Sequence, residues 1–415
     1  MMIESEKWSR IHTLVFTVFS ISTMIEAYIY SIAYIASNWV SVPRPLIALL
    51  SIWPPLWLLL GGALMGPLSD TIGRKRSLYI SLIMYIIGSM GLIFSINYVI
   101  LLISLAILML AVGGEYNTVM ISAHEYFPSG IRSRIVYLIL NFTNLGGALA
   151  TALVLINISS MILQKLALGL TILIVIPILY LLRSLIPESP YWLRARRLPY
   201  DNSRFDLIKN RNSNITIRLP SLTTRIAIGG LIGWSYTTGF TLLVLTFGPY
   251  YFPNLTNWLI FAFSISSLIS GIAIGMLADT ISRKSLLLLS SIGSLITSML
   301  ILLLIRSLIN AQYIFWILFI LFSILINTYF LTEDTLKSEY WVTRRRGSYT
   351  AIVRVISLGG SIPVIFLSSY LPVSSYLILV AVIFSVGFAA SLTWYLIGVE
   401  TGRGISIGAW EHGKQ

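Results

Sequence analysis

Long apolar runs separated by short polar segments fill most of the chain. About 20 apolar residues in a helix span the hydrocarbon core of a bilayer, and twelve runs reach or approach that length. The twelve runs are 11–36, 46–67, 78–96, 98–122, 135–158, 164–186, 225–248, 256–278, 285–306, 311–332, 350–371 and 374–398. Because they are continuous and do not alternate along the chain, helices are favoured over a membrane β-barrel. The pattern predicts an all-α membrane protein with twelve transmembrane helices.

The connections between the runs are short, with one exception in the middle of the chain. Segment 187–224 is long, polar and basic, and it separates an N-terminal part, 1–186, from a C-terminal part, 225–398, with a tail at 399–415. Six runs lie on each side of it. We therefore expect two pseudo-symmetric six-helix bundles joined by a linker loop.

Three features recur in both halves at nearly constant separation, which indicates an internal duplication. They are the motifs GPLSDTIGRK (66–75) and GMLADTISRKS (275–285), the pairs Glu125–Arg132 and Glu339–Arg346, and the glycine pairs 146–147 and 359–360, separated by 209, 214 and 213 residues. The charged residues of the first motif are expected to form a short turn in water. Parallel repeats of this kind are typical of proteins that rock two bundles around a site at the membrane midplane.

Composition and charge placement support the same topology. The chain is 57% hydrophobic and 10% charged, with mean hydropathy +0.87 and net charge +13. If the N-terminus is cytoplasmic, every Lys and Arg except Arg44, Lys165 and Arg306 lies at or near the cytoplasmic side. The positive-inside rule then places both termini in the cytoplasm of a cell membrane protein, with the lipid bilayer as its environment. This topology explains the basic charge better than nucleic-acid binding does.

Several motifs resemble those of the major facilitator superfamily. GPLSDTIGRK is similar to the superfamily's loop 2–3 motif, and PESPYWL at 187–193 to the PESPRWL signature of sugar porters and organic-ion transporters. GGEYNTV at 113–119, EYFPSGIRSR at 125–134 and RVISLGGSIP at 354–363 resemble patterns of the metabolite–proton symporter branch. The resemblance implies a secondary active transporter that works by alternating access.

The substrate is left open between three alternatives. A small organic carboxylate or related metabolite taken up with protons comes first, a sugar second, and export of an organic ion or drug third. The segment WSYTTGF at 234–240 lacks the Gln-Gln pair with which sugar porters bind hexose. A membrane sensor that does not transport is a further alternative. We expect no enzyme activity, cofactor or metal, since the chain has no cysteine, three scattered histidines and no nucleotide loop or nucleophile motif. We expect a monomer.

Two acidic residues inside predicted spans are candidates for proton coupling. Burying an ionisable group in a membrane is costly, so such a group suggests function. Ser22, Glu26 and Tyr30 share one helix face, which should point to a central cavity. Glu26 could carry the proton, stabilise helix packing or contact substrate. Glu115 could join Glu26 in a proton relay or pair structurally with an arginine.

Polar and aromatic residues in other spans are candidates for binding substrate, because such side chains offer apolar faces with one polar group. The candidates are Tyr30, Asn141, Asn144, Trp234, Tyr236, Thr238, Asn327 and Tyr329. Glu333, Asp334 and Arg354 near the inner ends of their spans could serve gating, coupling or attraction of an anion.

The resemblance also implies a gate of duplicated salt bridges that holds the cytoplasmic side closed. Its members are Asp70, Arg74, Glu125 and Arg132 in the first half and Asp279, Arg283, Glu339 and Arg346 in the second. Asp70 could instead stabilise the N-terminus of the third span, where a carboxylate is favourable. Alternatively, these charges only determine topology.

Overall fold

The computed structural model describes residues 8–36, 39, 44–128, 131–156, 160–189, 192–193, 196, 220–308, 312–341 and 345–401. Within these residues, twelve helices are long and apolar enough to cross a membrane, as the sequence predicts. The predicted linker and tail fall largely outside the described residues.

The long helices of the first half are α1 (Arg10–Ile35), α2 (Arg44–Ile72), α3 (Arg74–Ile93), α4 (Tyr98–Tyr126), α5 (Arg132–Leu155) and α6 (Met161–Leu185). Those of the second half are α8 (Leu222–Phe240), α10 (Thr256–Leu277), α11 (Arg283–Leu308), α12 (Gln312–Glu339), α13 (Arg346–Ser368) and α14 (Val373–Ile397). The span that begins with α8 continues through the π-helical segment η3 (Thr241–Thr246) into α9 (Phe247–Tyr251), and η4 (Pro253–Leu255) leads into α10. A π-helical turn is frequently found at a functional site.

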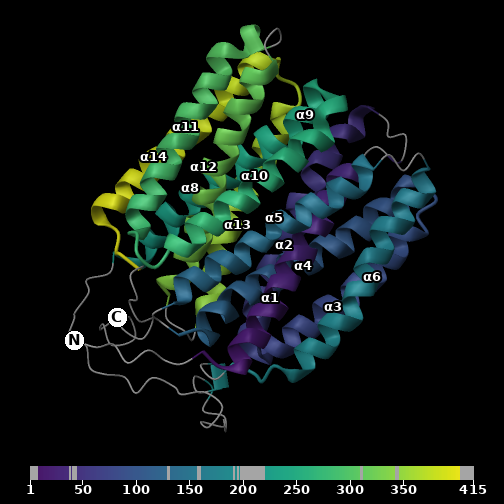
Figure 1. Ribbon diagram of the computed structural model, residues 1–415, viewed down its shortest axis with the longest axis vertical. Helices are drawn as coiled ribbons and strands as arrows, with labels where there is room; N and C mark the ends of the chain where they lie inside the picture. The colour runs from purple at the N-terminus through teal and green to yellow at the C-terminus, as the bar shows by residue number, and fades with distance from the viewer. Residues whose placement is uncertain are drawn as a thin grey trace.

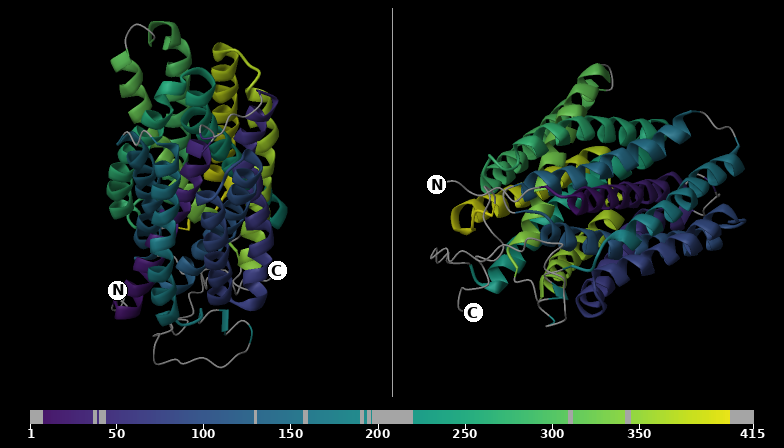
Figure 2. Two further views of the ribbon diagram at one scale, coloured as in Figure 1. Left: turned by 90° about the vertical axis from the view of Figure 1, so that its right-hand side faces the viewer. Right: turned by 60° about the horizontal axis from the view of Figure 1, so that its bottom comes forward.

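Each half has its own hydrophobic core. One core is built almost entirely from α1 to α6, and the other almost entirely from α8 to α14. Figure 1 shows the two groups of helices side by side, with α2 and α5 next to α10 and α13 along the boundary. The views in Figure 2 show the same two-bundle arrangement from other sides.

The contacts between helices follow the duplication. In the first half α1 packs on α5, α2 on α4 and α3 on α6, and the second half repeats these pairs as α8 with α13, α10 with α12 and α11 with α14. Across the boundary α2 packs on α13, and α5 packs on α10. Helix α2 corresponds to α10, and α5 corresponds to α13. Interchanging the two halves therefore turns one of these contacts into the other, so the boundary between the bundles is itself symmetric.

Several helices extend further than predicted, and at the ends of α2 and α12 the difference matters for the charged residues. Helix α2 runs to Ile72 and α12 to Glu339. The first motif is therefore mostly helical, and its turn is formed at Gly73, which has φ +103°. The expectation that Arg74 lies in water is wrong, because its side chain is 2% exposed and paired with carboxylates.

The glycine pairs do not match residue for residue at the predicted separation of 213. Gly146 lies against the backbone of α1 at Met24, and Gly360 lies against Trp234 of α8, the corresponding helix of the second half. Gly147 and Gly359 instead face the opposite half, at Ser264 and Leu59. Gly146 therefore matches Gly360, 214 residues later, which is the separation of the Glu–Arg pairs.

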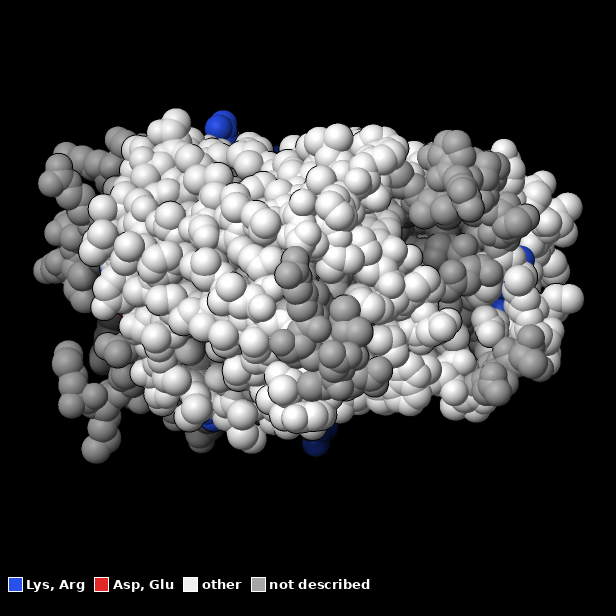
Figure 3. Space-filling view, turned by 90° about the horizontal axis from the view of Figure 1, so that it is seen from above, with Lys and Arg blue, Asp and Glu red and all other residues white. Residues whose placement is uncertain are grey.

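The surface agrees with a membrane environment. Many large apolar side chains are exposed on the outside of the bundles, for example Ile96, Leu303 and Leu396. In the space-filling view of Figure 3, white covers nearly all of the coloured surface, and only a few basic side chains are visible. A surface of this kind is stable in lipid and not in water.

Candidate functional site

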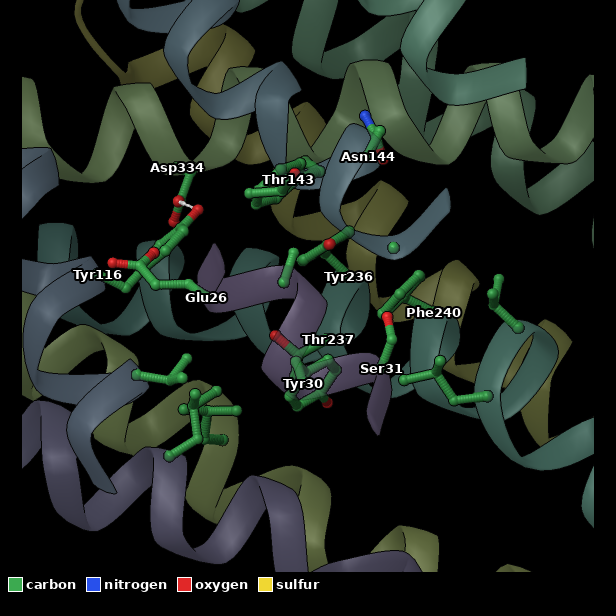
Figure 4. Close-up of a pocket in the computed structure, with 18 of the residues that line it drawn as sticks. Glu26, Tyr30, Ser31, Tyr116, Thr143, Asn144, Tyr236, Thr237, Phe240 and Asp334 are labelled. Carbon is green, nitrogen blue, oxygen red and sulfur yellow. Dashed lines mark hydrogen bonds between the residues drawn. The ribbon is translucent and has the colours of Figure 1, made fainter. Parts of the chain in front are cut away.

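A central cavity of about 180 Å³ lies between the two halves. Helices α1, α2, α4 and α5 line it from one side, and α8, η3, α10, α12 and α13 line it from the other. Because both bundles contribute, any movement of one against the other changes its shape. Figure 4 shows Glu26, Tyr116 and Asp334 close together at one end, with Ser31 and Phe240 further along.

Five charged or ionisable side chains and a tyrosine lie at the end of the cavity near Glu26. Asp334 accepts hydrogen bonds from the Tyr116 hydroxyl and from Arg354 Nη2, the latter at 3.1 Å, and it also pairs with Lys337. Lys337 Nζ lies 3.0 Å from Glu333 Oε2. The Arg354 guanidinium lies over the Tyr116 ring, 4.4 Å from its centroid, so α13 and α4 meet here. We call Glu26, Glu333, Asp334, Lys337 and Arg354 the ionic cluster.

Glu26 differs from the other acids of the ionic cluster because it has no partner. It is 1% exposed, and neither carboxyl oxygen has a hydrogen-bond partner among the described residues. Arg183, Glu115, Arg354 and Asp334 all lie near enough to act on it electrostatically. An unpaired buried carboxylate is unstable as an ion, which makes Glu26 the group best suited to take up a proton.

The rest of the cavity is aromatic and neutral. Tyr236 stacks with Phe240 and with Phe330, whose ring centroids lie 5.9 and 5.2 Å away. Hydroxyl and amide groups are interspersed among these rings, from Ser31, Thr143, Asn144, Thr237 and Ser264. Flat apolar faces beside neutral hydrogen-bonding groups suit a small solute that has both.

The predicted substrate residues divide into two groups. Tyr30, Asn144 and Tyr236 line the cavity. The others lie behind the lining: Asn141, Trp234, Thr238, Asn327 and Tyr329. Spacing along one helix could not separate the groups, because neighbouring helices decide which part of a helix face reaches the cavity.

Three predicted asparagines form a network that bridges the halves. Asn144 Nδ2 donates to Asn141 Oδ1 at 2.8 Å and to Asn327 Oδ1 at 2.9 Å. Asn141 donates to the Leu268 carbonyl oxygen, and Asn327 to that of Ser267. Asn141 and Asn327 therefore join α5, α10 and α12 rather than face the cavity.

Glu115 also lies outside the cavity lining. It pairs with Arg183 of α6 and accepts a hydrogen bond from the Ser81 hydroxyl of α3. Arg183 further donates to Ser22 Oγ, one turn before Glu26, at 2.7 Å. This geometry matches the structural alternative for Glu115, while its part in a proton relay stays a prediction.

The duplicated charged motifs meet at one end of the bundles, which we call the gate end. Arg74 Nη1 lies 2.8 Å from Asp70 Oδ1, and Arg74 Nη2 lies 3.1 Å from Glu125 Oε1. In the second half Arg283 Nη2 lies 3.0 Å from Glu339 Oε1. All these side chains are buried or nearly buried, and Arg132 is buried beside them.

Several contacts at the gate end cross from one half to the other. The Asp70 carboxylate accepts hydrogen bonds from Ser348 at the start of α13. Asp279 accepts one from the backbone N–H of Arg134 at the start of α5. Arg346 Nη1 lies 3.9 Å from Glu125 Oε1. Together these contacts join the two halves at the gate end.

The alternative that Asp70 stabilises the N-terminus of the third span is wrong. The carboxylate at the start of α3 is that of Glu188, whose Oε1 accepts the backbone N–H of Arg74 at 2.9 Å. Glu400 does the same at α11, where it accepts the backbone N–H of Arg283 at 2.9 Å. Asp70 lies instead at the N-terminus of α13, in the other half.

Some site residues were missed by the sequence analysis. Tyr116 and Lys337 line the cavity, and Arg183 pairs with Glu115. Asp334 and Arg354 were considered only as possible gating or coupling residues. The spacing of Asp334 and Lys337, i and i+3 on one helix face, was the available signal. This spacing was missed because the span was predicted to end at residue 332, before both residues.

Comparisons with known proteins agree with this architecture. Residues 16–214 match the family described as "Sugar (and other) transporter". A glucose transporter of Staphylococcus epidermidis is 32% identical over 160 residues, 36% of this chain and 35% of that protein. A D-xylose transporter of Levilactobacillus brevis is 36% identical over 77 residues, 19% of this chain and 17% of that protein. The chain thus aligns with about a third or less of these relatives' length.

Among solved structures, the proton:xylose symporter XylE bound to 6-bromo-6-deoxy-D-glucose has the same fold. The TM-score is 0.75 at 16% identity, over 96% of this chain and 98% of that one. The fold and the site define a class of protein: twelve helices in two pseudo-symmetric bundles around a central cavity. The chain has the fold of this major facilitator superfamily symporter. The relatives favour the sugar alternative over the carboxylate that the sequence analysis placed first.

Proposed function

We propose that the protein is a secondary active transporter that takes up a sugar or closely related solute together with protons by alternating access. The transporters among its relatives support the sugar class, and the two-bundle fold supports alternating access. The protein is then a transporter and not an enzyme. The gate end corresponds to the cytoplasmic side under the positive-inside rule.

The position of Glu26 is the observation on which the proposed proton coupling rests. Its side chain is buried, has no hydrogen-bond partner among the described residues and lines the cavity between the two halves. Alternating access requires these halves to move relative to each other. A proton from outside neutralises Glu26, and substrate then binds beside it. Closure of the outer side and separation of the gate end follow, because Glu26 no longer carries a charge in the loaded cavity.

In this cycle the gate end holds the outward-facing arrangement. The Asp70–Ser348 and Asp279–Arg134 contacts form in one state and separate in the other. Their combined strength has to stay within a few kcal/mol of the free energy of substrate and proton binding, since stronger contacts would trap the protein.

Uptake into proteoliposomes with an alkaline interior tests the proposal. Labelled D-glucose, D-xylose, D-gluconate and D-glucuronate are offered separately, with and without a protonophore. We expect accumulation of at least one probe that collapses with the protonophore. In Glu26→Gln, accumulation should be lost while counterflow, which needs no gradient, persists. Accumulation that persists in this variant would place coupling elsewhere. Absence of both uptake and counterflow for every probe would contradict the proposal.

A further inference from the structure

The ionic cluster contains more charge than a neutral solute requires. Lys337 and Arg354 both line the cavity, and both lie in helices of the second half. Hydroxyl groups of a neutral sugar are satisfied by uncharged donors and acceptors, which this cavity already has in Ser31, Thr143 and Asn144. Buried ion pairs contribute little to stability and are costly in a membrane, so their presence in a cavity suggests use.

The charges of the ionic cluster balance except for one. Arg354 pairs with Asp334, and Lys337 pairs with both Asp334 and Glu333, so these four side chains carry no net charge. Nearby, Glu115 and Arg183 neutralise each other. The remaining group is Glu26. The surroundings of the cavity end are therefore neutral when Glu26 is protonated and carry one negative charge when it is ionised.

Arg354 also has a hydrogen-bond donor that no described residue uses. Its Nη2 binds Asp334, whereas its Nε has no hydrogen-bond partner among the described residues, although the residue is buried. The guanidinium lies over the Tyr116 ring, with its Cζ atom 4.4 Å from the ring centroid. The Nε and Nη2 groups of one edge bind a carboxylate through two parallel hydrogen bonds.

We propose that the substrate is a sugar acid, a polyhydroxylated solute with one carboxylate, which binds Arg354 and Lys337 in place of Asp334 while Glu26 holds the cotransported proton. The sugar ring lies toward Tyr236 and Phe240, where Figure 4 shows the cavity continuing away from Glu26 and Asp334. The inference rests on the proposed function and names the substrate of the same site.

Proton and anion then favour each other's binding. Protonation of Glu26 removes one negative charge from the cavity end, and the substrate carboxylate restores it. The net charge around the cavity is the same in the empty ionised state and in the loaded protonated state. Coupling of this kind is reciprocal: a proton raises the affinity for the anion by the same factor as the anion raises the affinity for the proton. One anion with one proton also makes transport electroneutral.

The experiment measures binding of D-glucuronate and D-glucose to the purified full-length protein in nanodiscs at several pH values. We expect D-glucuronate to bind more tightly than D-glucose. Its dissociation constant should rise up to tenfold per pH unit once Glu26 ionises. In Glu26→Gln this pH dependence should disappear, and binding at alkaline pH should stay tight.

The cations are tested separately. Arg354→Gln should weaken D-glucuronate binding by about tenfold to a hundredfold, the effect of losing a bidentate ion pair. Arg354→Lys should restore part of the loss. Lys165→Gln, which removes a cation at the other end of the bundles, should leave D-glucuronate binding unchanged. Thermal melting of each variant separates loss of folding from loss of binding.

The outcomes distinguish this inference from the proposed function. Proton-driven accumulation of D-glucose or D-xylose without any binding of D-glucuronate or D-gluconate would overturn the sugar-acid inference and leave the proposed function standing. D-Glucuronate binding that is unchanged in a folded Arg354→Gln variant would also overturn it. Absence of uptake and counterflow for all four probes would reject both.

Discussion

Asp70 and Ser348 are 278 residues apart in the chain, yet Asp70 Oδ2 accepts hydrogen bonds from the Ser348 backbone N–H at 3.1 Å and from its hydroxyl at 3.0 Å. The contact places a carboxylate of the first half at the N-terminus of α13 in the second half, where the helix dipole favours negative charge. Asp279 and Arg134 make the reciprocal contact at the start of α5. Each duplicated motif therefore stabilises a helix of the other half.

Asp70→Asn should loosen the gate end. The change removes the charge that binds Arg74 and the α13 N-terminus, and hydrogen bonds to a charged group contribute about 1.5–3 kcal/mol each. We expect the population open at the gate end to rise about tenfold or more. The chain has no native cysteine, so a single Thr143→Cys in the cavity can be labelled from the gate side in inside-out vesicles. The measured quantity is its maleimide reaction rate.

Two variants calibrate that measurement. Ser348→Ala keeps the backbone donor and removes only the hydroxyl, so its labelling rate should rise less. Thr71→Ala changes an exposed neighbour that bonds only within α2, and its rate should stay that of the parent. Equal rates in Asp70→Asn and the parent would show that this contact does not hold the gate end closed.

The Glu115–Arg183 ion pair predicts a non-additive effect on stability. Glu115→Leu leaves the Arg183 guanidinium buried without its partner, which costs about 3–5 kcal/mol. The double variant Glu115→Leu with Arg183→Leu removes both charges and should recover most of the loss. Thermal unfolding in detergent measures all three proteins. A double variant as unstable as the single one would mean that the other bonds of Arg183, to Ser22 and Leu78, dominate.

Helix α1 approaches α5 so closely at Gly146 that no side chain fits. A Cβ atom there would lie 1.9 Å from the Met24 carbonyl oxygen, which belongs to a backbone that cannot move alone. We expect Gly146→Ala to lower the melting temperature strongly. Gly359→Ala is the matched control, because its Cβ would meet only a Leu59 methyl group at 3.2 Å. Similar melting temperatures for the two variants would contradict this explanation of the helix contact.

Gly73 and Ser282 occupy equivalent turns and should respond differently to substitution. Gly73 has φ +103°, a conformation that costs a residue with a side chain about 1–3 kcal/mol, and an added Cβ would collide with the Glu188 carboxylate. Gly73→Ala should therefore destabilise the protein. Ser282 bonds Glu400 and accepts the backbone N–H of Ser285 at 3.3 Å, so Ser282→Gly should lose less. Thermal unfolding measures the stability of both variants. A larger loss of stability in Ser282→Gly than in Gly73→Ala would contradict the prediction.

Glu188 predicts a dependence of stability on pH. Burial raises the pKa of its carboxyl group above the ordinary 4.5, although the backbone N–H groups of Ser189, Lys75 and Arg74 oppose the shift. The folded state then binds the proton more tightly than the unfolded state, so this stabilisation is present at low pH and is lost as the pH rises through the folded pKa. Glu188→Gln should lose less stability than the parent between about pH 4 and 7. Parallel melting curves against pH would contradict the shift.

The twelve spans and the internal duplication are readable from the sequence because the bilayer imposes a length and a composition on each helix. The prediction of Glu26 as the coupling group has the same origin, since a carboxyl group in an apolar span is conspicuous. Its place in the cavity fits that prediction, and its role in coupling remains to be measured.

The sequence could not decide which polar residues face the cavity. Asn141 and Asn144 are three residues apart on one helix face, yet only Asn144 lines the cavity, because Asn141 is turned to the backbone of α10. Asp70 looked like a cap for its own neighbouring helix, whereas the fold gives that position to Glu188 and brings Asp70 to α13. Contacts between segments hundreds of residues apart leave no local pattern.

By itself, the sequence determined the number of helices, their division into two related halves and the presence of rare charges within the spans, because each of these is a local property of chain and solvent. Only the tertiary structure decided the pairing of those charges. It joined Arg354 and Lys337 to Asp334, joined Arg183 to Glu115, and left Glu26 unpaired in the cavity. Pairing depends on which helices pack together and how each is rotated, and packing is a property of the whole bundle.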